Sequence, residues 1–186
     1  MKTAVLLHGT GGSDTNYFWF AETKKRLEQS GYEVWWPLLP NTEKPALKES
    51  LDFLEEHHNL LHWNEEMIVV GHSSACPLIL AWLENFKIRI KQVVLVSGFY
   101  QSIDDEGYSD LMLPESFNWE NIKIKAKEII LINSDNDPWG CNDQQARQPA
   151  IELGAKLIVA TGQGHMGSIS FDQPYKNFPL LTKLIE

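Results

Sequence analysis

A serine flanked by small residues stands between two apolar runs. Residues 71–75 read GHSSA with Ser73 at the centre, a β-branched run precedes them, and a longer helix-like apolar stretch follows. A tight strand-to-helix turn admits only small residues two positions before and two after its central serine, and it pushes the hydroxyl into a cleft. The pattern predicts that Ser73 is a nucleophile that attacks a carbonyl carbon.

Two later polar segments supply the other groups that such a serine needs. One apolar run leads into SDNDPW at 134–139, and another leads into TGQGHMG at 161–167. Imidazole titrates near neutrality, so we predict that His165 is the base. Asp137 is preferred over Asp135 as its acidic partner, because Pro138 biases the residue before it toward an extended or turn conformation. Asp135 remains an alternative, and either acid also fits a plain turn.

The glycine-rich sequence HGTGGS at residues 8–13 follows the first apolar run. Glycine lets backbone approach a ligand closely. We predict that Thr10 or Gly11 supplies one N–H of an oxyanion hole, and that Ser74, at a helix start, supplies the other. A phosphate loop is disfavoured because the Gly-Lys-Ser/Thr sequence is missing, and the glycine spacing does not match the dinucleotide fingerprint.

An aromatic-rich excursion at residues 99–127 is longer than an ordinary connection between a strand and a helix. Such segments are usually functional or disordered. Beside a cleft, this one predicts a small lid or pocket wall, with one more surface helix as the alternative. We expect substrate contacts from His8, Leu113, Phe117, Trp139 and Met166.

Strand-like and helix-like segments alternate along the chain and would position these groups. The expected strands are Thr3–Leu7, Glu33–Trp36, Met67–Val70, Gln92–Ser97, Glu128–Asn133 and Lys156–Ala160. The expected helices are Phe18–Gln29, Pro45–Leu61, Ser74–Asn85, Gln144–Leu153 and Tyr175–Ile185. Alternation predicts an α/β fold with three layers, in which helices cover both faces of a mostly parallel six-stranded sheet. We expect one domain over residues 1–186, strand order 2-1-3-4-5-6, and a cleft above strands 1 and 3.

Composition narrows the partners. The net charge of −9 and the lack of a basic cluster argue against nucleic acid, and no apolar run is long enough for a membrane span. Cys76 and Cys141 make no disulfide framework, so we expect a cytoplasmic protein. The spacing of His58 and His62 suits zinc but lacks a third ligand. We therefore expect no metal and no cofactor.

These motifs together resemble the small serine hydrolases of the α/β-hydrolase superfamily, in the YdeN-like group that includes retinoblastoma-binding protein nine. The resemblance covers nearly the whole chain. It rests on the segments HGTGG at 8–12, IVVGHSSA at 68–75, VVLVS at 93–97, DP at 137–138 and GH at 164–165.

The resemblance implies a compact fold and a Ser-Asp-His triad, matched by Ser73, Asp137 and His165. It also implies hydrolysis of small esters or amides. The retinoblastoma-binding segment Leu-x-Cys-x-Glu is not matched, because Trp63 stands where that motif has cysteine. We expect a cofactor-free esterase acting on a small acyl substrate, with amides and thioesters left open. The alternative is a catalytically weak binding or adaptor protein that kept the fold.

Overall fold

The computed structural model describes residues 2–15 and 17–185; the two ends of the expected 1–186 domain, residues 1 and 186, lie outside them. Six strands form one sheet in the spatial order β2-β1-β3-β4-β5-β6, and each neighbouring pair is parallel. The strands are β1 Lys2–Leu7, β2 Tyr32–Trp35, β3 Ile68–His72, β4 Ile90–Val96, β5 Ala126–Asn133 and β6 Lys156–Val159. The expected strand order is confirmed, and the expected "mostly parallel" sheet is parallel throughout.

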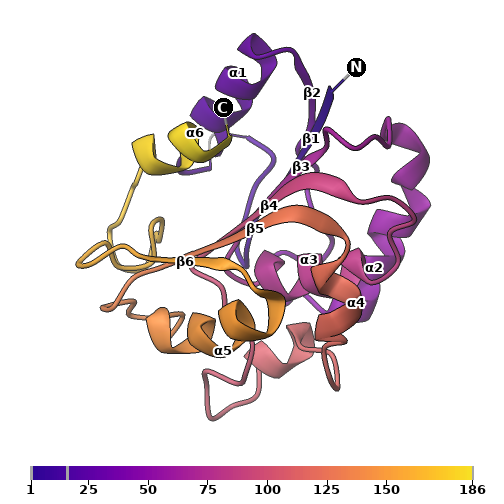
Figure 1. Cartoon of the computed structure of the whole chain (residues 1–186). Helices are drawn as coiled ribbons and strands as arrows, with labels where there is room; N and C mark the ends of the chain where they lie inside the picture. The colour runs from indigo at the N-terminus through magenta and orange to yellow at the C-terminus, as the bar shows by residue number, and fades with distance from the viewer. Residues whose placement is uncertain (1, 16, 186) are drawn as a thin grey trace.

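Helices cover both faces of this sheet (Figure 1). One face carries α1 Phe20–Gln29 and α6 Pro179–Ile185, and the other carries α2 Leu47–Glu56, α3 Ala75–Leu83, α4 Trp119–Lys123 and α5 Asp143–Leu153. Alternate residues of β1 serve the two sides: Val5 and Leu7 join the apolar cluster under α3, whereas Ala4 and Leu6 join the cluster under α1. This two-sided burial explains why the central strands are continuously apolar, and it confirms the expected three layers.

Two expected helices are shorter in the structure. The helix expected at 45–61 is α2 followed by a separate 3₁₀ turn at His58–Leu60. The rings of His57 and His58 bond the carbonyls of Phe53 and Glu55, which satisfies acceptors at the helix end. The helix expected at 175–185 begins only at Pro179, whose fixed φ suits a first helical position.

The 99–127 excursion contains structure that the sequence analysis did not resolve. A 3₁₀ turn spans Ser109–Met112, α4 follows, and β5 has begun by Ala126. The Asn118 side chain caps α4 by accepting from the backbone N–H of Asn121. None of the helices in the described part of the chain is long and apolar enough to span a membrane.

The strand order reverses at β1, with β2 on one side and β3 on the other. Connections from neighbouring strands leave in opposite directions there, so the carboxyl ends of β1 and β3 border a crevice. Ser73 and the glycine-rich loop at 8–12 follow these two strands directly.

Candidate active site

Ser73 occupies a strained turn between β3 and α3. Its φ is +56°, a left-handed conformation that is uncommon for a residue with a side chain. The backbone N–H of Ser73 donates to the Val96 carbonyl at 2.9 Å, which ties the turn to the end of β4. A Cβ on Gly71 would lie 2.3 Å from Ile79 Cδ1 of α3, so strand and helix leave no room for a larger residue there. This is the geometry expected of an exposed nucleophile.

The loop after β1 packs directly on Ser73. A Cβ added to Gly9 would stand 2.7 Å from Ser73 Cβ and 3.3 Å from Ser73 Oγ, so only glycine fits at this position. On the other side of the turn, Thr10 Oγ1 donates to Ser74 Oγ at 3.0 Å. These contacts hold the backbones of the two loops at a fixed separation.

Two backbone N–H groups beside Ser73 face the tests set by the sequence. Gly11 donates its N–H to the Thr42 carbonyl at 2.7 Å, so that group is already engaged. Of the two alternatives, the geometry therefore favours the N–H of Thr10 as the first oxyanion donor. Ser74 stands directly before α3, where the helix dipole favours negative charge on a ligand.

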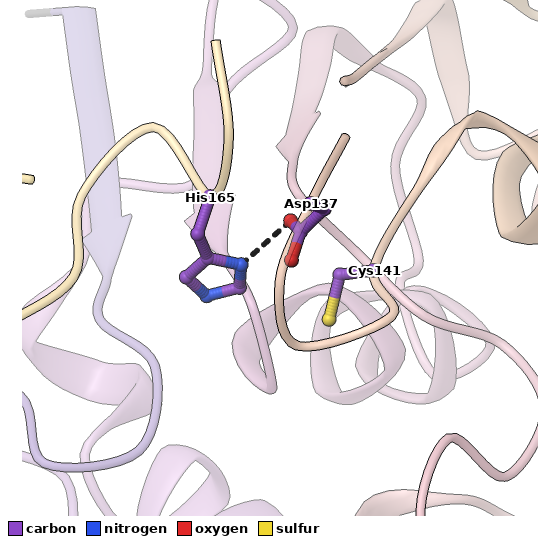
Figure 2. A group of neighbouring side chains, drawn as sticks. All are labelled: Asp137, Cys141 and His165. Atoms are coloured by element: carbon purple, nitrogen blue, oxygen red, sulfur yellow. Dashed lines mark hydrogen bonds and ion pairs between the residues drawn. The ribbon is translucent and has the colours of Figure 1, made fainter. Parts of the chain in front are cut away.

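His165 and Asp137 form a buried pair. His165 Nδ1 lies 2.7 Å from Asp137 Oδ2, and the Asp137 side chain is fully buried (Figure 2). Asp137 Oδ1 accepts from the Trp139 N–H at 2.8 Å, so both carboxylate oxygens are engaged. A carboxylate at Nδ1 fixes the neutral ring with its proton on that nitrogen, which leaves Nε2 unprotonated. Asp135 instead accepts from the Gly162 N–H at 2.8 Å and supports the loop.

The backbone of His165 is clamped from beneath. Its carbonyl accepts from His72 Nε2 and from Ser97 Oγ, both at 2.9 Å. His72 is fully buried, and this burial, with the nearby His165, lowers the His72 pKa to about 3. The His72 ring is therefore neutral at ordinary pH, and the clamp consists of two uncharged hydrogen bonds.

A cavity of about 710 Å³ lies above these groups and is bordered by both Ser73 and His165. Apolar side chains make most of the wall, and Glu43, Asp104 and Glu106 outnumber Lys44 among the charged ones. Tyr17 and Phe18 line one side, while Ile103, Tyr108 and Met112 come from the excursion. The cavity can hold a small, largely apolar molecule with a carbonyl group at Ser73.

Of the five residues expected to contact substrate, the structure brings only Trp139 to the cavity. His8 is buried and bound through both ring nitrogens, because Nδ1 bonds the Gly9 carbonyl and Nε2 accepts from the Leu39 N–H. Met166 is fully buried in the cluster under α1. Leu113 and Phe117 pack against the opposite core cluster. These four expectations are corrected: the side chains support the site from outside the cavity.

The cavity residues that the sequence analysis missed carried a weak signal. Tyr17 and Phe18 open an aromatic run directly after the glycine loop, which placed them beside the cleft. Ile103 and Met112 lie in the excursion that was singled out, but its weak periodicity gave no means of choosing which residues face inward. The His58 and His62 pair does not assemble, since His58 bonds the Glu55 carbonyl and His62 lies beside Glu33.

Comparisons with known proteins agree with this geometry. The sequence model of a serine hydrolase family matches residues 4–186. The putative hydrolase YdeN of Bacillus subtilis (strain 168) is 35% identical over 99% of this chain and 94% of its own length. The serine hydrolase RBBP9 of Rattus norvegicus is 29% identical over 91% of this chain and 90% of its own length.

The fold is shared as well. The crystal structure of the B. subtilis ydeN product superposes with a TM-score of 0.89 at 28% identity, covering 100% of this chain and 97% of that one. The likeness confirms the α/β-hydrolase fold that the sequence motifs implied.

Proposed function

The chain belongs to the serine hydrolase family, and from this premise we propose that it hydrolyses small carboxylic esters through an acyl-enzyme on Ser73. The single observation that carries the proposal is the buried hydrogen bond of 2.7 Å between His165 and Asp137, at the edge of a cavity that Ser73 also borders. An adaptor that had lost catalysis would have no need to keep a paired imidazole beside a strained serine.

The proposed reaction has two halves. Ser73 Oγ attacks the ester carbonyl while His165 Nε2 takes the hydroxyl proton, and the imidazolium is stabilised by Asp137. The N–H groups of Thr10 and Ser74 stabilise the oxyanion. The tetrahedral intermediate then breaks its bond to the alcohol, which leaves with the proton from His165. A water molecule repeats the sequence on the acyl-enzyme and releases the carboxylic acid.

The cavity supports a neutral acyl substrate. Its wall is mainly apolar, and the acidic side chains around it repel an anionic ligand. We propose that residues 1–186 act as one hydrolase domain and that the first part of the 99–127 excursion forms a pocket wall. Both cysteines are free and buried, which fits the reducing cytoplasm as the location.

Labelling with a fluorophosphonate probe tests the nucleophile directly. The unmodified protein should label at Ser73, and Ser73→Ala should neither label nor hydrolyse a short aryl ester, with a loss of roughly 10⁶ in kcat if the three groups act as a unit. Ser30→Ala, which removes an exposed hydroxyl after α1, serves as the matched control. Esterase activity that survives in Ser73→Ala would put the nucleophile elsewhere, and an unlabelled native protein would favour the adaptor.

A further inference from the structure

A third potential metal ligand stands beside the buried pair. Cys141 Sγ, one Asp137 carboxylate oxygen and a His165 ring nitrogen all lie within 4.8 Å of one another, and all three residues are buried (Figure 2). We propose that Asp137, Cys141 and His165 form an inhibitory binding site for a thiophilic divalent cation such as Zn²⁺ or Cd²⁺.

The distances fit a modest rearrangement. In tetrahedral zinc sites with one nitrogen, one oxygen and one sulfur ligand, the donor atoms lie about 3.4 to 3.6 Å apart, as the usual metal–ligand lengths require. The His165–Asp137 contact of 2.7 Å would have to open and the sulfur would have to move inward, each by about 1 Å or less. Cys141 and His165 both border the cavity, so the fourth position opens toward solvent.

The kinds of donor select the cation. Thiolate and imidazole favour zinc and its heavier relatives, whereas magnesium and calcium require oxygen ligands. A divalent ion with one thiolate and one carboxylate makes a neutral group, which lowers the cost of burying it. The loop is also held in place, because Asn133 Nδ2 donates to the Cys141 carbonyl at 2.9 Å.

Binding at this site would remove the base. The cation takes the lone pair of His165 Nδ1, the proton formerly on Nδ1 moves through solvent to Nε2, and the thiol proton of Cys141 is released to water. Nε2 then carries a proton and can no longer accept one from Ser73. The loss of activity rests on the proposed function, whereas the metal binding does not.

Cys76 offers a matched control for Cys141. Both cysteines are free and buried, but the Cys76 thiol lies 3.4 Å from the Val96 carbonyl and is not part of the three-residue group. The test titrates Cd²⁺ into the purified protein and follows the ultraviolet band of cadmium–thiolate charge transfer. In parallel, ester hydrolysis is measured against Zn²⁺, with each variant normalised to its own rate in the presence of a chelator.

We expect the unmodified protein and Cys76→Ala to give the Cd²⁺ band and to lose activity with Zn²⁺, recovering it when a chelator is added. Cys141→Ala should lose the band and need at least about tenfold more Zn²⁺ for half inhibition. Cys141→Ser replaces it if the alanine variant fails to fold. Mg²⁺ should have no effect.

The outcomes separate the two proposals. A band or a Zn²⁺ sensitivity that survives the loss of the Cys141 thiol overturns the metal site and leaves the esterase intact. A band that depends on Cys141 without inhibition overturns the blocking of His165. A protein that hydrolyses no ester still tests the metal site through the band alone.

Discussion

The floor and the wall of the cavity are held in different ways. The floor consists of loops from different strands that bond to one another: Ser73 to the end of β4, and the His165 carbonyl to His72 and Ser97. In the wall at 102–112, the bonds are local, since Asp104 accepts from the N–H groups of Tyr108 and Ser109. Tyr108 is 58% exposed, whereas His72 and Ser97 are buried.

This difference separates chemistry from selectivity. Groups that must meet within hydrogen-bond distance sit where bonds from several strands fix them, because a small displacement costs much of the rate. Groups that only surround the acyl chain can sit on a segment held by its own short-range bonds. Floor substitutions should therefore lower kcat, while wall substitutions should change KM and chain-length preference.

Asp137→Asn should show the largest difference between floor and wall. The variant keeps the shape but loses the carboxylate that fixes the His165 tautomer, so we expect kcat to fall by about 10⁴. Asp135→Asn is the matched control in the same turn, because its carboxylate bonds the Gly162 N–H and not the imidazole. Steady-state ester hydrolysis measures both. A larger loss in Asp135→Asn would reverse the assignment of the acid.

Gly9→Ala tests whether the floor tolerates displacement. The added methyl would stand 2.7 Å from Ser73 Cβ and 2.9 Å from the His72 carbonyl oxygen, so the nucleophile must shift. We expect kcat to fall roughly 10²-fold with the protein still folded. Gly31→Ala introduces a methyl into open space after α1 and should cost stability but not turnover. Equal turnover in the two variants would mean that the floor is more pliable than its bonding indicates.

His72→Gln tests the clamp through stability. The folded pKa of about 3 lies below the ordinary value of 6.5, so as pH falls below 6.5 the unfolded chain takes up a proton that the folded chain refuses. Stability contributed by neutral His72 is therefore present above 6.5 and is lost as pH falls toward 3.

Glutamine can keep the donor to the His165 carbonyl but does not titrate. Between pH 7 and pH 5, the free energy of unfolding should fall by about 2 kcal/mol less in His72→Gln than in the unmodified protein. Urea unfolding at the two pH values measures this difference, with His62→Gln as an exposed-histidine control. Parallel pH profiles for the His72 variant and the native protein would argue that His72 is charged in the fold.

Tyr108→Asp should give the smallest effect and tests the wall. We expect KM for long acyl esters to rise roughly fivefold, because a half-exposed ring supplies only part of an apolar contact, while acetate esters change little. Leu111→Asp is the control, since Leu111 is similarly exposed at 41% but does not border the cavity. Equal effects on long and short esters would remove Tyr108 from the acyl pocket.

Local patterns were enough for the order of the strands and for which segments carry reactive groups. Period, composition and small flanking residues identified Ser73, and polar residues after later strands identified Asp137 and His165 as candidates. The same reasoning failed for His8 and Met166. Both stand next to site residues in the chain, but adjacency in sequence does not say which way a side chain points once the loop has turned.

The residue types alone determined which chemistry this chain can offer and that a parallel sheet would carry it, because period and turn preference act over a few neighbouring residues. Only the folded chain decided which of two aspartates meets the imidazole, which N–H beside the serine is already engaged, and that a cysteine stands beside the acid. Those outcomes depend on contacts between residues far apart in the sequence, and such distances exist only once the loops from several strands have packed together.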